Sequence, residues 1–272
     1  MTTTPATDLR PHLVLQALSV AGVCAALMGL AHAGRLPLLV GVAVLQLLLL
    51  LAFLALVEAP ASGGVFLLGM ATAVAADLTV HLDDGGAGGL AGVIALALVA
   101  SLLHQLVRRN RTRVTESFGD TLVVVVLVAS AAALPAALAH PEGETAVRVG
   151  LLAGGAALVV GRVADLVLQR FAVAPGASRG WPGVVLALTV GVALAVPEAG
   201  DHLTHREAML VGLACAAAAA VADLFVDLAA LEVVGSRAEE RRRGALRPVI
   251  ALLPFALVAP VLLTAVRLLE RT

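Results

Sequence analysis

The chain has 272 residues, of which 60% are hydrophobic and 14% are charged, and its formal net charge is −1. Soluble globular domains have about 45–50% apolar and about 25% charged residues. This chain is more apolar and less charged than such domains, and its mean hydropathy of +1.01 is correspondingly high. This composition excludes a soluble enzyme, a secreted disulfide scaffold and a disordered chain, and the balanced charge gives no indication of nucleic-acid binding. We therefore expect an all-α, polytopic integral membrane bundle that forms a single transmembrane domain over residues 1–272.

Apolar runs separated by short polar breaks predict about nine transmembrane helices. The runs approach the ~20 residues that cross a bilayer core about 30 Å thick. They cover residues 13–33, 36–57, 64–82, 88–107, 121–139, 146–170, 182–197, 207–234 and 248–269. We expect residues 1–12 to be a short cytoplasmic tail. The first run favours an anchor over a cleaved signal, because signal cores have only about 7–15 apolar residues.

The prolines indicate helix starts and kinks in these predicted helices, and the cysteines indicate packing positions. Three prolines stand at predicted helix starts, and three lie inside predicted helices and are expected to kink them. The first set is Pro37, Pro182 and Pro248, and the second set is Pro135, Pro254 and Pro260. Cys24 and Cys215 lie inside apolar runs, which indicates small packing residues rather than a disulfide.

The arginines predict the orientation of the bundle, because cytoplasmic segments of membrane proteins carry the excess of positive charge. The sequence has no lysine, so all 18 basic residues are arginine. With residues 108–113 in the cytoplasm, the inner set is Arg10, Arg108, Arg109, Arg111, Arg113, Arg170, Arg179, Arg237, Arg241, Arg242, Arg243 and Arg247. The outer set is smaller: Arg35, Arg148, Arg206, Arg267 and Arg271. We therefore expect a cytoplasmic N-terminus, an external C-terminus and a multi-pass location in the inner (plasma) membrane of a bacterium.

Ionisable residues inside the predicted helices are candidate site residues, because a charge at the bilayer centre costs about 2.5–3.5 kcal/mol or more. Three such helices contain the sequence Ala-Asp-Leu, at Asp77, Asp165 and Asp223. Asp227 follows Asp223 by four residues and shares its helical face. Two carboxylates one turn apart need a positive partner, and Mg²⁺ with phosphate oxygens is one possibility. Neutralisation by Arg162 is the other, although Arg162 can also pair with Asp165 three residues on.

A metal site in the predicted outer segment 201–207, which contains two histidines, has no diagnostic ligand spacing. The arginine-rich cytoplasmic segments set topology first. Binding of anionic lipid headgroups is a natural second role for them.

The rarer residues at the cytoplasmic breaks resemble those of the phosphatidate cytidylyltransferase (CDP-diacylglycerol synthase) family. Four short stretches carry the resemblance, in the order and spacing of the family: 113–117 (Arg-Val-Thr-Glu-Ser), 174–183 (Ala-Pro-Gly-Ala-Ser, then Trp-Pro-Gly), 222–224 (Ala-Asp-Leu) and 259–261 (Ala-Pro-Val). The similarity covers roughly residues 110–261. It implies a polytopic helical fold, CTP and phosphatidate as ligands, Mg²⁺ at Asp223 and Asp227, and phosphate contacts from Arg162, Ser178 and Arg179.

The chain also departs from the family at positions that carry the chemistry. The paired lysines of the family loop are Arg179 and Gly180 here, and its glutamate is Pro182. The Lys-Arg, His-Gly-Gly and paired acids that follow the family's Gly-Asp-Leu are replaced by residues such as Ala230, Ala245 and Ile250. Phosphoryl transfer depends almost entirely on positioning and charge neutralisation, and a two-metal site needs several converging carboxylates. We therefore expect little or no cytidylyltransferase activity.

Three functions stay open at this point. The first is a catalytically degenerate cytidylyltransferase-like protein that binds anionic lipid or nucleotide in phospholipid metabolism. The second is a small ion- or proton-coupled transporter that uses Asp77, Arg162, Asp165 and Asp223, with the glycine pairs 63–64 and 154–155 permitting close packing or unwinding. The third is a structural subunit whose charges pair inside the bundle. Expected partners are membrane lipids, with a second copy or another membrane protein as a possibility.

Overall fold

The computed structural model describes residues 10–57, 62–82, 87–107, 113–167, 180–200, 202–233 and 239–270. These residues form ten α-helices and no strand. The helices are α1 (Arg10–His32), α2 (Arg35–Val57), α3 (Ser62–Leu82), α4 (Ala87–Val107), α5 (Val114–Ala131), α6 (Ala133–Ala137), α7 (Gly143–Val167), α8 (Trp181–Glu198), α9 (His205–Val233) and α10 (Glu239–Leu269). The expected all-α class is therefore confirmed.

Within the described chain, nine helical stretches are long and apolar enough to cross a membrane, with α5 and α6 counted together as Val114–Ala137. The burial pattern is the reverse of that of a soluble protein. Leu96 and Val107 are 73% and 81% exposed, whereas Arg162 and Asp223 are 3% and 4% exposed. Apolar side chains on the outside and ionic groups on the inside are what a lipid environment favours.

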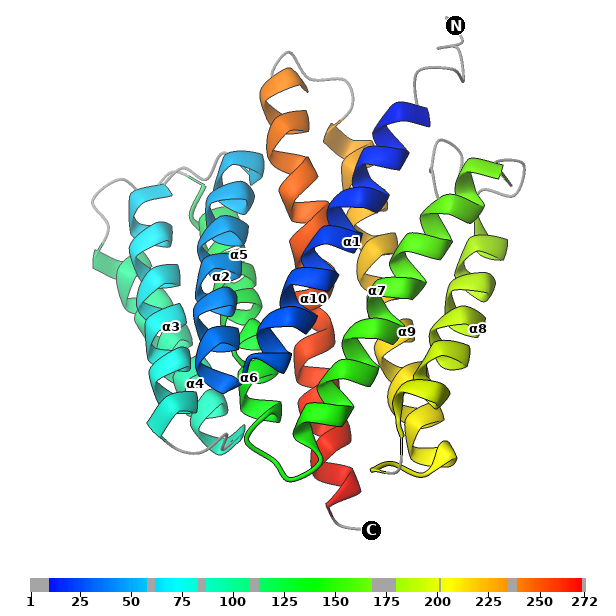
Figure 1. Cartoon of the computed structure of the whole chain (residues 1–272). Helices are drawn as coiled ribbons and strands as arrows, with labels where there is room; N and C mark the ends of the chain where they lie inside the picture. Colours follow the sequence, from blue (N-terminus) through cyan, green and yellow to red (C-terminus); the bar gives the residue numbers. More distant parts are fainter. Residues whose placement is uncertain are drawn as a thin grey trace, which may run out of the picture.

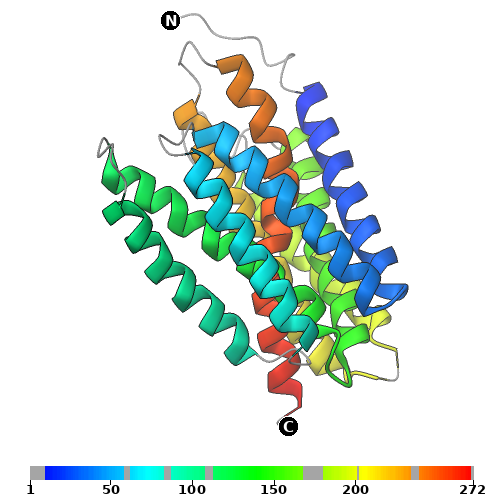
Figure 2. The same cartoon turned by 90° about the vertical axis from the view of Figure 1, so that its left-hand side faces the viewer.

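Two groups of helices lie on either side of α10 (Figure 1). Helices α2, α3, α4 and α5 form one group, and α1, α7, α8 and α9 form the other. Helix α10 contacts members of both groups, including α9 and α2. Successive long helices run in opposite directions, so that the N- and C-terminal ends lie at opposite ends of the bundle (Figures 1 and 2).

Most helix boundaries lie within about three residues of the predicted ones, and two helix starts differ by more. Helix α5 begins at Val114 rather than 121, and α10 begins at Glu239 rather than 248. The early start of α10 places Pro248 inside the helix and not at its beginning, so that prediction is wrong. Arginine and alanine are good helix formers, and the polar Glu239–Arg247 segment continues the helix although it is too polar to count as an apolar run.

The other prolines lie inside or at the start of the helices, as their predicted positions require. Pro37 lies in the first turn of α2, and Pro182 stands at the start of α8. The break between α5 and α6 falls at Ala132. Pro135 has no N–H, so it cannot donate to the carbonyl of Ala131 four residues earlier. Pro254 and Pro260 both lie inside α10, which is one continuous helix, so the helix does not break at either of them.

Small residues let α7 pack closely against its neighbours. A Cβ at Gly155 would overlap Cys24 of α1, and a Cβ at Gly150 would lie 3.0 Å from the Sγ of Cys215 on α9. Cys24 and Cys215 are both buried and free, as predicted. Close approach of backbones at small residues is the usual way in which helices associate in membranes. It places α7 between α1, α8, α9 and α10.

Candidate functional site

The centre of the α7 group is an ion pair between Arg162 of α7 and Asp223 of α9. The guanidinium Nη2 donates to Asp223 Oδ1, and both side chains are almost completely buried. Arg162 Nη1 also donates to Gln16 Oε1 of α1 at 3.3 Å, and Nη2 lies 3.5 Å from the carbonyl oxygen of Ile250 in α10. Four helices therefore meet at one buried guanidinium. We call this cluster, together with Asp165 and Asp227, the Arg162 centre.

Asp165 lies one turn after Arg162 and joins the start of α8 to this centre. Its Oδ1 accepts a hydrogen bond of 2.9 Å from the backbone N–H of Gly180, and the side chain is 2% exposed. A carboxylate at a helix N-terminus satisfies a backbone donor and interacts favourably with the helix dipole. Gly183 is required here, because a Cβ at this position would overlap the carboxylate of Asp165. The Trp-Pro-Gly stretch is thus a backbone cradle for Asp165.

Asp227 is half-buried and lies one turn after Asp223 on α9. The negative charges of Asp227 and Asp165 both act on the Arg162 guanidinium. The centre therefore collects three carboxylates around one arginine. Coulomb energies grow as the effective dielectric falls, so these charges interact more strongly here than they do at a wet surface.

The ion pair decides between the two roles foreseen for Arg162. Arg162 does not turn back to Asp165 but reaches across to Asp223, which is the neutralisation by arginine that the sequence left open. Arg162 Nε is buried and has no hydrogen-bond partner among the described residues. An anion such as a phosphate oxygen can accept a hydrogen bond from that N–H.

The fit of a metal ion to these residues is poorer. In the part of the chain that the structure describes, no three His, Cys, Asp or Glu side chains converge on a point that could hold a metal. Asp223 Oδ1 already accepts from Arg162, and Mg²⁺ demands near-octahedral oxygen coordination. We derive no step through Mg²⁺, and its predicted binding at Asp223 and Asp227 stays a prediction.

Two predicted phosphate contacts, Ser178 and Arg179, lie outside the described residues. Gln16 of the Arg162 centre was not predicted from the sequence, and Gly180 and Gly183 were named there only within the family-like loop and Trp-Pro-Gly stretch, without their contacts to Asp165. An amide inside an apolar run was the available signal for Gln16. In the segment predicted to be external, Thr204 and Glu207 form a capping box at the start of α9, in which the Thr204 N–H donates to the Glu207 carboxylate at 2.8 Å.

A second polar contact lies in the other group of helices. Gln46 of α2 donates through Nε2 to Asp77 Oδ1 of α3 at 3.1 Å and to the carbonyl oxygen of Val128 in α5 at 2.9 Å. The sequence singled out Asp77 as a candidate but missed Gln46. Asp77 is therefore separate from the Arg162 centre and does not join Asp165 and Asp223 in one continuous cluster.

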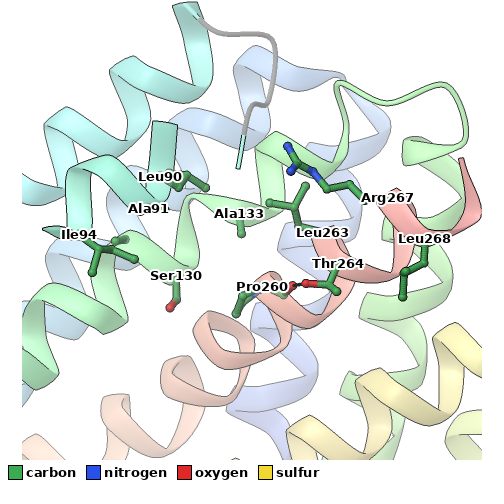
Figure 3. Close-up of a pocket in the computed structure, with 11 residues that line it drawn as sticks. Leu90, Ala91, Ile94, Ser130, Ala133, Pro260, Leu263, Thr264, Arg267 and Leu268 are labelled. Atoms are coloured by element: carbon green, nitrogen blue, oxygen red, sulfur yellow. Dashed lines mark hydrogen bonds between the residues drawn. The ribbon is translucent and has the colours of Figure 1, made fainter. Parts of the chain in front are cut away.

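A cavity of about 430 Å³ lies between α4, the α5–α6 break and α10. Figure 3 shows Leu90 and Ile94 of α4 on one side, Pro260 and Leu263 of α10 on another, and Arg267 at one edge. The lining is apolar apart from Ser130, Thr264 and Arg267. None of the residues predicted as site residues lines it.

No family model, curated protein or solved structure matches this chain. A function for this chain is therefore argued from its own side chains and their contacts.

Proposed function

We propose that this chain is a multi-pass membrane protein that binds a phosphate-bearing anionic lipid or nucleotide at the Arg162 centre. In this proposal it is a diverged relative of the phosphatidate cytidylyltransferases that has kept a phosphate pocket and lost most of the catalytic groups. The observation that carries it is the buried guanidinium of Arg162, whose Nε has no acceptor among the described residues.

The position of the centre supports this proposal. Arg162 is five residues before the end of α7, so it lies about 8 Å along the helix from that end. That end of the bundle is the one from which α1 starts, and the arginine distribution assigns it to the cytoplasm (Figure 1). A guanidinium at this depth lies within reach of a lipid phosphate at the inner surface, where nucleotides are also present.

The positions at which the chain departs from the phosphatidate cytidylyltransferase pattern support the expected loss of cytidylyl transfer. No lysine exists in the chain, and Asp223, the acid in the place of the family's Gly-Asp-Leu carboxylate, is engaged by Arg162. Removal of one preorganised group that stabilises transition-state charge typically costs about 3–4 kcal/mol. The loss of several such groups leaves binding as the activity that the remaining residues support.

The test is a binding measurement on purified protein in neutral phosphatidylcholine nanodiscs. One arm adds phosphatidate, and the other adds CTP, each with and without Mg²⁺. Hydrogen bonds to a charged group are worth about 1.5–3 kcal/mol, so Arg162→Gln is expected to weaken binding about tenfold or more. Arg148→Gln is the matched control, because Arg148 lies on the same helix in a half-exposed ion pair with Glu198 at 2.9 Å.

Asp223→Asn separates the two ways in which phosphate can bind. If the phosphate contacts Arg162 directly, removal of the competing carboxylate tightens binding. If Mg²⁺ bridges the phosphate to Asp223, the same substitution weakens binding and removes its Mg²⁺ dependence. Binding that is unchanged in both Arg162→Gln and Asp223→Asn contradicts the proposal, and leaves the centre as a structural ion pair.

A turnover assay completes the test. Labelled CTP, phosphatidate and Mg²⁺ are incubated with the wild-type protein and with Asp223→Asn. We expect no cytidylyl transfer from either protein. Turnover by the wild type that disappears in Asp223→Asn would show an active enzyme with a rebuilt site, contrary to the expected loss of activity.

A further inference from the structure

The contact between Asp77 and Gln46 has features that the Arg162 centre does not explain. Asp77 of α3 is 9% exposed and Gln46 of α2 is 1% exposed. Their hydrogen bond of 3.1 Å joins a carboxyl group to a neutral amide, whereas Asp223 is joined to a guanidinium. A buried carboxylate is normally paired with a positive group or neutralised.

The contact lies deep in the bundle. Gln46 is 11 residues from either end of α2 (Arg35–Val57). At 1.5 Å per residue Gln46 lies about 16 Å from each end of α2, whereas Asp77 lies five residues, about 8 Å, before the end of α3 (Ser62–Leu82). Both positions are inside the apolar part of the bundle, where an ionised carboxylate is costly.

The side chain of Gln46 has one acceptor that lacks a hydrogen-bond donor among the described residues. Its NH₂ group donates to Asp77 Oδ1 and to the carbonyl oxygen of Val128, which uses both protons. Exchange of the amide oxygen and nitrogen would place an oxygen against the Val128 carbonyl, so this carbonyl fixes the orientation of the amide. Gln46 Oε1 is then a buried acceptor without a donor among the described residues. An unsatisfied buried acceptor costs about 1–3 kcal/mol.

The charged and titratable groups on the helices that pack against α3 lie elsewhere. The described helices concerned are α2, α4, α5 and α6. Arg35 of α2 donates to the carbonyl oxygen of Val80, three residues after Asp77, and His81 lies one turn after Asp77 on α3 with an exposed side chain. Among the described residues, the side chain that bonds to the Asp77 carboxyl is Gln46 and neither of these two. His104 of α4 faces Gly64, thirteen residues before Asp77 and so about 20 Å along α3. Asp120 and Glu116 of α5 precede Val128 by eight and twelve residues, about 12 and 18 Å along the helix, and α6 has no charged residue.

We propose that Asp77 is a proton-binding site inside the membrane, separate from the phosphate site, and that it is a neutral carboxylic acid at neutral pH. The bound proton removes the buried charge, and the carboxylic O–H becomes the donor that Gln46 Oε1 lacks. Release is the simple dissociation of the acid to a carboxylate and a proton. A monovalent metal ion is the less suitable ligand, because a hard cation needs several converging oxygens and Asp77 and Gln46 offer few.

The experiment is infrared spectroscopy of the purified full-length protein in lipid at neutral pH, in the region where protonated carboxyl groups absorb and carboxylates do not. We expect a protonated-carboxyl band in the wild type that is lost in Asp77→Asn and retained in Asp223→Asn, because Asp223 forms an ion pair with Arg162. Gln46→Leu is expected to shift the band, because the acid loses its hydrogen-bond partner. A rise in pH should convert the band to carboxylate absorption.

Two results would overturn the proposal. If Asp77→Asn removes no protonated-carboxyl band, Asp77 is ionised in the folded protein. If Na⁺ or K⁺ abolishes the band at constant pH, the site binds a metal cation in preference to a proton. Neither result depends on phosphate binding at Arg162, so failure of this proposal and failure of the proposed function are distinguishable.

Discussion

At the residue scale, the buried Arg162–Asp223 pair makes a specific prediction about stability. When only one member of a buried ion pair is removed, an uncompensated charge remains, which typically costs about 3–5 kcal/mol. Arg162→Met and Asp223→Leu are each expected to destabilise the fold by about this amount, whereas the double variant is expected to lie within about 1–2 kcal/mol of the wild type. Thermal unfolding in detergent, followed by circular dichroism, measures the effect.

The Arg148–Glu198 pair provides the control. Its side chains are 33% and 29% exposed, and exposed ion pairs contribute only about 0–1 kcal/mol. Arg148→Met should therefore have a small effect on the same helix. Additive losses in the Arg162/Asp223 double variant would show that the two side chains do not interact energetically.

A second residue-scale prediction concerns Gly183. Its Cβ position is filled by the Asp165 carboxylate, so Gly183→Ala forces α8 away from α7 or displaces Asp165 from the Gly180 N–H. Overpacking of this kind costs about 1–3 kcal/mol. Gly92→Ala is the matched control, because nothing lies within 4 Å of the Cβ position of Gly92. Equal unfolding temperatures of the two variants would contradict the proposed cradle.

At the scale of the elements, small residues set the distance between α8 and α9. A Cβ at Gly212 of α9 would overlap the Cβ of Ala195 on α8. We expect Gly212→Ala to destabilise the fold by about 1–3 kcal/mol, and the exchange Gly212→Ala with Ala195→Gly to restore most of the loss. A double-mutant cycle of unfolding temperatures gives the coupling, and the absence of any rescue by Ala195→Gly would place the strain elsewhere.

The sequence predicted the elements better than it predicted their ends or their contacts. Hydropathy located the nine apolar stretches found among the described residues, because a helix long and apolar enough to cross a membrane is visible as a run of about 20 apolar residues. It could not place the start of α10, because the segment before Pro248 is helical but polar. Pairing was harder still: Asp77 and Arg162 were visible as charges in apolar runs, but the partner of each depends on which helices touch, and that is a property of tertiary packing.

At the scale of the whole molecule, the two polar centres divide between the two helix groups. The Arg162 centre lies among α1, α7, α9 and α10, and the Asp77–Gln46 contact lies among α2, α3 and α5. Helix α10 packs against both groups. Each centre has its own hydrogen bonds and is therefore open to separate substitution.

The orientation of the whole bundle is the final prediction, and the structure offers a matched pair of positions for it. Glu116 near the start of α5 and Glu144 near the start of α7 lie toward opposite ends of the bundle (Figure 1), and their side chains are 57% and 56% exposed. The native cysteines are buried, so an impermeant maleimide should react only with a cysteine introduced at either position. The excess of arginine on the side of Glu116 predicts that this side faces the cytoplasm. We therefore expect Glu144→Cys to be labelled in intact cells and Glu116→Cys only after permeabilisation, and the reverse pattern would place the Arg162 centre near the outer surface, away from cytoplasmic nucleotides.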